Sequence, residues 1–233
     1  MRDEVVALTW EPMRIHVAVL FAGLVAQTAL AQDFTPRGGT DEYSLNLLVV
    51  GSKRYAFEGG AAARNEGGAG IGASLARNLN SHLALGAEVT FSQFDYRAGV
   101  APGAGNAGAG FDVDGNMETI ALRLQATWYL LSGRITPLLT GSVGVNFLDP
   151  EFTANAPANA CWAYPWHGQV CSGAAPKTTL TRFAYGAAIG LRVDLPRKQG
   201  FIRALVGGEW IDFSEPSSTI GYAQLRADFG VTF

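Results

Sequence analysis

The sequence is short of charge, histidine and cysteine, and each shortage excludes a class of function. Charged residues make up 16% of the 233 residues, below the roughly 25% usual for soluble domains. The 17 lysines and arginines are scattered along the chain, with never more than two in a row, so no basic cluster offers the footprint of a nucleic-acid-binding protein. The three histidines and two cysteines do not combine with carboxylates at metal-ligand spacing, so we expect no metal and no cofactor.

Catalytic motifs are missing as well. The glycine-rich segments 67–72 and 103–110 lack the strand-to-helix context of a phosphate-binding loop. His82 lies next to a predicted turn and His167 in a predicted loop, and neither is followed by the serine of a His-x-Ser arrangement. We therefore expect a protein without enzymatic activity.

The N-terminal residues predict a cleaved leader. Residues 15–24 form an apolar run after Arg14, and Ala29-Leu30-Ala31 follows, which is typical of a secretory signal peptide. The stretch is shorter than the roughly 20 apolar residues of a transmembrane helix. We expect residues 1–31 to be the leader and 32–233 the mature domain. Met13 is an alternative initiator, because residues 1–12 are more acidic than the start of a signal peptide.

The mature chain shows repeated alternation of apolar and polar residues, which is typical of strands with one apolar face. From Glu118 to Leu130, for example, Ile120, Leu122 and Leu124 share a face, and Thr119 and Arg123 share the other. The predicted strands are 43–51, 70–79, 83–91, 118–130, 135–147, 181–195, 201–213 and 219–233. Eight antiparallel strands of this kind predict an all-β, up-and-down barrel.

The predicted connections alternate between tight turns and longer loops. Tight turns are expected at 78–81, 131–134 and 196–200, and loops at 58–67, 99–115 and 149–178. The last connection, 214–218, is expected to be short. Such an arrangement is typical of transmembrane barrels, with short periplasmic turns and longer extracellular loops.

Alternation alone leaves open which face of the strands meets solvent, because a soluble lipocalin-like barrel turns its apolar face inward. Strand length and aromatic placement favour a membrane barrel, since strands of 9–11 residues already cross a bilayer. Aromatic residues stand near both ends of the apolar faces, as interfacial girdles would. They are Phe91, Phe147, Phe183 and Trp210 toward the loops, and Trp128, Phe229 and Phe233 toward the turns.

With a signal peptide, eight strands and a last strand ending in phenylalanine, the chain resembles the small outer-membrane barrels of the OmpA, OmpX and opacity-protein type. The resemblance covers residues 32–233. It implies a location in the cell outer membrane and contact with outer-membrane lipid and lipopolysaccharide. It also implies that Phe229, Val231 and Phe233 are the signal read by the barrel-assembly machinery.

The polar faces of the predicted strands carry balanced charge, which would fall inside a narrow lumen. Four bases and four acids are concerned: Glu88, Arg123, Arg192, Asp194, Arg203, Glu209, Arg226 and Asp228. An eight-stranded barrel is just wide enough for side chains to fill, so these charges are expected to pair across it. A structural plug is one interpretation, and a gated ion path or proton relay is the other.

The longest predicted loop contains both cysteines. Cys161 and Cys171 are predicted to form a disulfide in an oxidising compartment. Between them lies an aromatic cluster that would form either a ligand-contacting surface or a self-packed cap. Its members are Trp162, Tyr164, Trp166 and His167, with Pro165 among them.

The sequence thus predicts a non-enzymatic outer-membrane barrel with a structural or adhesin-like role, whose loops meet an extracellular ligand or surface partner. The alternative is a narrow porin-like or OmpW-like channel for ions or small apolar molecules. Such a channel needs an apolar lumen, for which the candidates are Leu48, Val50, Leu138, Leu205 and Ile211.

Overall fold

The computed structural model describes most of the chain after residue 36. The described residues are 37–56, 62–100, 111–154, 161–164, 168–171, 179–195, 200–213 and 218–233. The predicted leader, 1–31, and its cleavage site lie outside them and stay predictions. In the described part of the chain, no helix has the length and apolar character needed to cross a lipid bilayer.

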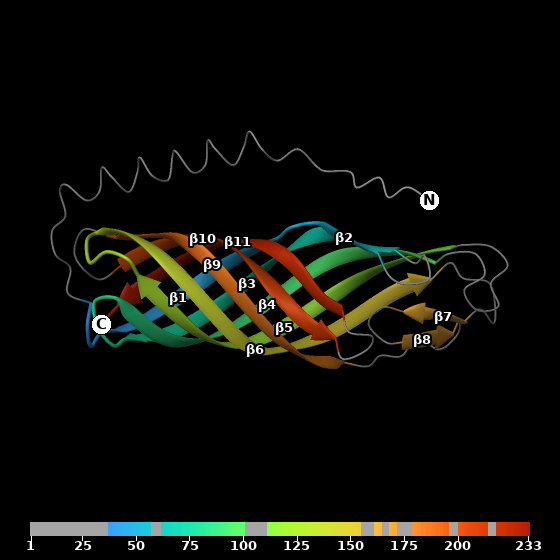
Figure 1. Cartoon of the computed structure of the whole chain (residues 1–233), viewed down its shortest axis with the longest axis horizontal. Coiled ribbons are helices and arrows are strands. Elements are labelled where there is room, and N and C mark those ends of the chain that lie inside the picture. The colour runs from blue at the N-terminus through green and yellow to red at the C-terminus, as the bar shows by residue number, and fades with distance from the viewer. Residues whose placement is uncertain are drawn as a thin grey trace, which may run out of the picture.

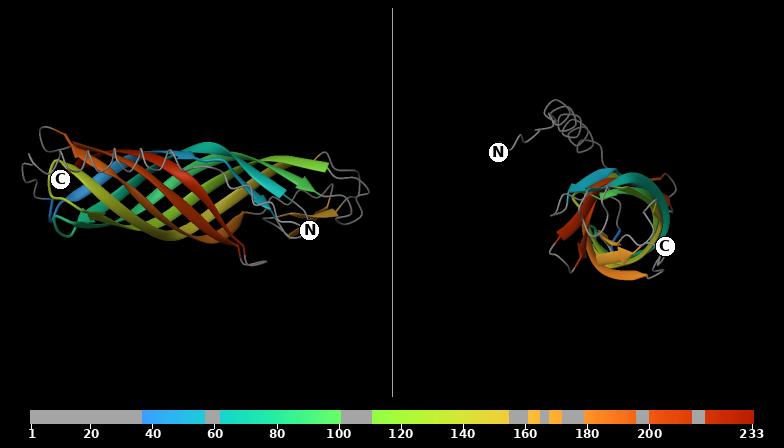
Figure 2. Two further views of the ribbon diagram at one scale, coloured as in Figure 1. Left: turned by 45° about the horizontal axis from the view of Figure 1, so that its top comes forward. Right: turned by 90° about the vertical axis from the view of Figure 1, so that its right-hand side faces the viewer.

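Eight strands close into an antiparallel barrel, as predicted (Figures 1 and 2). The order around the barrel is β1-β11-β10-β9-β6-β5-β4-β3, and β1 pairs with both β11 and β3 to close the ring. The strands are β1 (Asp41–Val50), β3 (Ala62–Asn78), β4 (Leu83–Val100), β5 (Phe111–Tyr129), β6 (Ile135–Ala154), β9 (Leu180–Asp194), β10 (Gly200–Phe213) and β11 (Ser218–Thr232).

Three short strands lie outside the ring. β2 (Lys53–Ala56) pairs with β3 beyond the end of β1, so it prolongs the first strand after a break at Gly51 and Ser52. β7 (Cys161–Tyr164) and β8 (Gly168–Cys171) form a separate two-stranded sheet. That sheet lies at the end of the barrel where the longest connection runs, here termed the long-loop end (Figure 1). The opposite end is the short-turn end.

The predicted sidedness of the strands is confirmed. On β1 the residues from Glu42 to Val50 alternate buried and exposed. The inward positions are polar from Glu42 to Asn46 and apolar after it, and Tyr43, Leu45 and Leu47 face outward. β5 behaves in the same way, with Ile120 outward and Arg123 inward. Because every strand follows this rule, the barrel has an apolar outer surface and a largely polar lumen.

Several strands extend further toward the long-loop end than the sequence predicted. β4 runs on to Val100, β5 begins at Phe111 and β6 runs on to Ala154, so both ends of the predicted loop 99–115 and the start of the predicted loop 149–178 are strand. Beyond Phe91 the polarity of β4 inverts: Phe94 and Tyr96 are buried, and Gln93 is exposed. A prediction that assigns apolar residues to the outward face therefore ends the strand at the inversion, before its true end.

The same inversion occurs in neighbouring strands at the same level. Phe91, Ile120 and Phe147 are register partners, and they form the last apolar row on the outside. The part of the barrel beyond this row, here termed the upper barrel, has a mainly apolar interior and a polar exterior. Its buried apolar residues are Phe94, Tyr96, Met117, Leu148, Ile211 and Tyr222, and the polar side chains of Asn65, Ser92 and Thr119 are buried with them.

A second apolar layer fills the lumen toward the short-turn end, where Ala84, Tyr129, Leu138 and Leu205 pack together. Phe201 is also buried here, and its ring has room only because residue 230 is glycine. A Cβ atom at Gly230 would collide with the Phe201 ring. The lumen is therefore occupied by side chains near both ends.

We predict that Gly230→Ala destabilises the folded barrel by about 1–3 kcal/mol, because the added methyl group overpacks the site of Phe201. Gly141→Ala is the matched control, since a Cβ there has nothing within 4 Å. Urea titration of both refolded variants measures the two free energies of unfolding. Equal losses would contradict the close packing of Phe201 against Gly230.

Candidate functional site

Ten charged side chains form one continuous ion-pair network inside the barrel. Acids and bases alternate along it, so every interior member lies between two opposite charges. In order from the middle of the lumen toward the short-turn end, the network is Glu209, Arg123, Glu88, Arg226, Asp228, Arg203, Glu42, Arg192, Asp194 and Arg37. Five acids and five arginines leave no net charge.

The half of the network nearer the long-loop end is centred on Arg123 and Glu88. Arg123 NH2 lies 2.6 Å from Glu209 Oε2, and Arg123 NH1 lies 3.2 Å from Glu88 Oε1. Glu88 also pairs with Arg226, across the barrel from β4 to β11. Neutral amides complete the set, because Asn46 donates to Glu88 at 3.0 Å and a second asparagine donates to Glu209. Each carboxylate therefore accepts several hydrogen bonds.

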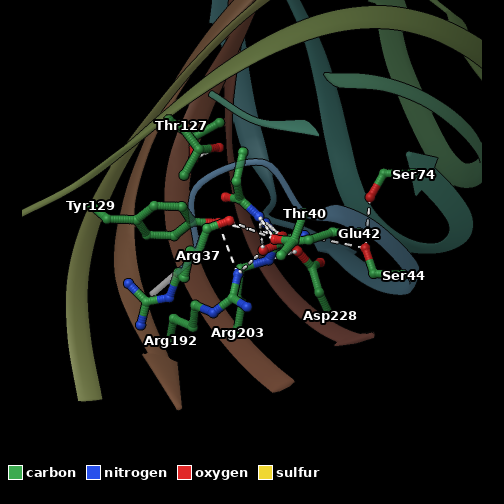
Figure 3. A network of polar contacts seen from close by, with 12 residues as sticks. Arg37, Thr40, Glu42, Ser44, Ser74, Thr127, Tyr129, Arg192, Arg203 and Asp228 are labelled. Atoms are coloured by element: carbon green, nitrogen blue, oxygen red, sulfur yellow. Dashed lines mark hydrogen bonds and ion pairs between the residues drawn. The ribbon is translucent and has the colours of Figure 1, made fainter. Parts of the chain in front are cut away.

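The other half of the network is drawn in Figure 3, where side chains from β1, β9, β10 and β11 point toward one another. Glu42 is its centre: Arg192 NH1 lies 2.6 Å from Glu42 Oε1, and Arg203 NH1 lies 3.7 Å from Glu42 Oε2. Arg203 also pairs with Asp228 at 3.0 Å. Both Glu42 and Arg192 are 1% exposed, so this pair is removed from bulk water.

Two aromatic rings support the guanidinium groups. Arg192 and Arg203 lie over the ring of Phe201, with 4.0 and 4.7 Å to its centroid. Arg37 and Arg192 lie over Tyr129 at 4.9 and 5.3 Å. A buried guanidinium over an aromatic face gains cation–π attraction in addition to its ion pairs. Tyr129 also belongs to the hydrogen-bond network, because its hydroxyl accepts from Arg192 NH1 at 2.9 Å and donates to Glu42 Oε2 at 3.4 Å.

The structure brings together all eight of the lumen charges that the sequence singled out. Sequence reasoning missed Arg37 and Glu42. Glu42 occupies the first inward position of β1, one residue before the predicted start of that strand. Arg37 precedes β1 and belongs to no strand, so no periodicity marked it.

Arg37 closes the network at the short-turn end. It pairs with Asp194 at 2.6 Å and is 2% exposed. Its NH2 also donates to the carbonyl oxygen of Gly133 at 2.7 Å and to Thr136 Oγ1 at 2.9 Å. The segment before β1 is thereby tied to the turn between β5 and β6 and to the end of β9.

A small cavity lies beside the network. Its volume is about 30 Å³, enough for about two water molecules, and Arg123, Arg226, Gln125 and Gln224 are among the residues that line it. Gln125 Nε2 and Gln224 Oε1 are buried without a protein partner. Water bound in the cavity would satisfy both amides, but the space is far smaller than an ion pathway along the lumen.

The remaining predicted site residues lie elsewhere. Cys161 and Cys171 are direct register partners in the β7–β8 sheet, a backbone separation that suits a disulfide, which stays a prediction. Trp162 and Tyr164 are on β7, but their side chains, and Trp166 and His167 entirely, lie outside the described residues. On β11 and just after it, the side chains of the predicted assembly signal face outward and are exposed: Phe229, Val231 and Phe233.

No protein-family model and no curated protein sequence matches the chain. Three solved structures are similar over most of their length. The outer membrane protein OprG of Pseudomonas aeruginosa is 10% identical, with 84% of this chain and 97% of that chain covered and a TM-score of 0.46. The attachment invasion locus protein Ail of Yersinia pestis is 15% identical, with coverages of 84% and 99% and a TM-score of 0.47. Neisserial surface protein A is 12% identical, with coverages of 82% and 95% and a TM-score of 0.45. At these identities and TM-scores the matches add nothing to what strand pairing shows by itself.

We predict strong coupling between Glu88 and Arg226. Arg226→Met should cost about 3–5 kcal/mol, because it leaves buried carboxylates undercompensated. Combining it with Glu88→Gln should cost less than the sum of the single changes by about 1–3 kcal/mol.

The exposed pair of Asp41 and Arg77, 3.5 Å apart, is the control, and its coupling should stay below about 1 kcal/mol. Urea unfolding of the two double-mutant cycles gives both coupling energies. Similar values for the two pairs would show that burial does not strengthen the lumen network.

Proposed function

We propose that the chain is an integral outer-membrane β-barrel with a structural or surface-interaction role and no enzymatic activity, whose lumen is sealed by the ion-pair network. The apolar outer surface of the closed barrel carries the proposal. Large apolar side chains that are 40–70% exposed would be a severe liability in water. Lipid is the solvent that suits apolar side chains. A closed barrel can also enter lipid without leaving backbone groups unpaired, because it has no free strand edge.

The exposed apolar residues form a belt of the height that a bilayer requires. On β5 the outward positions from Ile120 to Leu130 are apolar throughout. Ten residues at a tilt of about 40° rise about 26 Å, close to the roughly 25 Å band of outer-membrane barrels. Trp128 lies near one edge of this belt, and Phe91 and Phe183 lie near the other. These aromatic residues match two interfacial girdles.

Occupation of the lumen supports a sealed barrel. The ion-pair network fills the middle and the short-turn end, and the apolar interior of the upper barrel lies above it. Opening a water path would separate several buried ion pairs at once, each at a cost of a few kcal/mol. We infer that the network stabilises and fixes the barrel instead of transporting a substrate.

The long-loop end is the proposed interaction surface. In an outer membrane this end faces outward, because the tight turns lie on the periplasmic side. The predicted aromatic cluster of 162–167 belongs to this end, and an extracellular ligand or surface partner would meet it there. Contacts with lipopolysaccharide and with the barrel-assembly machinery belong to the same proposal.

A narrow channel for ions or small apolar molecules is the second candidate. Inward placement of all five apolar lumen candidates favours it: Leu48, Val50, Leu138, Leu205 and Ile211 are each at most 5% exposed. They do not line one passage, however, since Glu209 of the network lies between Leu205 and Ile211 on β10. The sealed barrel therefore explains more of the lumen.

Membrane insertion predicts a contrast along one face of β5. Ala126→Arg, in the middle of the belt, should destabilise the protein in lipid vesicles by about 2–4 kcal/mol. Glu118→Arg, outward on the same strand but above the belt, should cost at most about 1 kcal/mol. Urea unfolding in vesicles measures both, and a barrel that is not embedded would tolerate both changes equally.

A planar-bilayer recording separates the two candidate functions. The unaltered protein should show no steady single-channel conductance. Arg123→Ala combined with Arg226→Ala removes both cationic partners of Glu88, so conductance should appear while stability falls. Resolved steady openings of the unaltered protein would favour the channel and reject the sealed lumen.

A further inference from the structure

Three arginines lie in one cross-strand row on the outside of the upper barrel. Arg54 of β2 is the register partner of Arg64 of β3, and Arg64 is the register partner of Arg97 of β4. Directly opposed residues in antiparallel strands place their side chains on the same face. Tyr96 is buried, so its neighbour Arg97 points outward, and all three arginines are exposed. We term this set the arginine row.

Like charges placed directly opposite one another weaken a sheet. Arg97 is compensated, because its Nε lies 2.6 Å from Asp114 Oδ1 and its NH1 lies 3.7 Å from Glu66 Oε1. Among the described residues, no ion pair within 4.0 Å involves Arg54 or Arg64. Within the part of the chain that the structure describes, two adjacent guanidinium groups thus lie on the surface without an acidic side chain in ion-pair distance.

The surface at the same level on the neighbouring strands is acidic. Glu118 and Asp149 are register partners, and both are exposed just above the last apolar row, as is Asp95 on β4. An anion that approached the barrel at this level would be repelled by β5 and β6. It would be attracted to the side formed by β2 and β3.

The arginine row stands above the belt but within reach of a membrane surface. Arg97 is six residues beyond Phe91, which corresponds to a rise of about 15 Å at a tilt of about 40°. Arginine side chains bend back toward an interface while their stems cover apolar surface. The polar headgroup layer of an ordinary bilayer extends only about 5–8 Å beyond the hydrocarbon core. The phosphorylated saccharide headgroup of an outer-leaflet glycolipid is larger and extends further.

We propose that Arg54 and Arg64, which lie beside Arg97, form a docking surface for the phosphate groups of a lipopolysaccharide-type glycolipid. The proposal rests on the proposed outer-membrane location and names one lipid partner and its side of the barrel. Guanidinium groups bind phosphate through paired N–H donors, and two adjacent groups suit a doubly charged monoester. Binding would also relieve the repulsion between the opposed arginines.

The test uses the full-length mature barrel in phosphatidylcholine vesicles, to which rough lipopolysaccharide or its dephosphorylated form is added. Glycolipid retained by the repurified protein is measured by mass spectrometry, and the apparent affinity by titration. The unaltered barrel should prefer the phosphorylated form at least tenfold. Arg54→Gln combined with Arg64→Gln should abolish this preference, and Arg54→Lys combined with Arg64→Lys should retain part of it.

Arg77→Gln is the matched control. Arg77 is on β3 like Arg64, is 64% exposed and faces outward, but it lies at the short-turn end. Its substitution should leave the preference unchanged. An equal loss in this variant, no loss in the double glutamine variant, or equal binding of both glycolipids would each overturn the proposal.

Two further measurements separate the outcomes. Insertion of each variant into vesicles without glycolipid, followed by the mobility difference between boiled and unboiled protein, tests the membrane location alone. If the barrel inserts normally but shows no glycolipid preference, the proposed binding role of the arginine row is rejected, whereas the proposed membrane location is retained. Binding of soluble heparin that depends on Arg54 and Arg64, in the absence of any glycolipid preference, would replace the lipid by a sulfated polysaccharide.

Discussion

Compensation of buried charge in a narrow lumen is the constraint on which the rest of this barrel depends. Eight strands leave no room for hydrated ions beside the side chains, so each carboxylate must meet a guanidinium group directly. The network meets this demand by alternation, with five arginines and five acids in one continuous order. Phe201 and Tyr129 hold the arginines from the side, and Gly230 is needed because Phe201 lies where a Cβ would stand.

A second organising feature is the inversion of polarity along the strands. Within the belt the apolar side chains face outward and the charges inward. In the upper barrel Phe94 and Tyr96 face inward, and Arg97 faces outward. One continuous sheet thus has an apolar outer surface at one level and a polar outer surface at the next. The proposed glycolipid surface lies in the water-facing part, beyond the edge of the belt.

Strand number, antiparallel order and sidedness follow from the sequence, because alternation with period two persists through every strand in the belt. The ends of the strands do not, since β4 and β6 continue past the inversion and their polar outward residues resemble a loop. Eight network charges were found by the same rule. Extending the alternation of β1 back by one inward position would have found Glu42, whereas Arg37 sits outside any strand and its role depends on the closed fold alone.

Closure of the barrel and completion of the ion-pair network are one event in folding. Glu42 is 150 residues from Arg192 in the chain, and Ser44 is 159 residues from Arg203, so the first strand reaches these partners only when it joins the last. Until then Arg192 and Arg203 lack Glu42, and each keeps only one acidic partner, Asp194 for Arg192 and Asp228 for Arg203. Contacts of such long range slow folding. A sheet with a shifted register would separate Glu42 from both arginines, so the buried charges favour the native register.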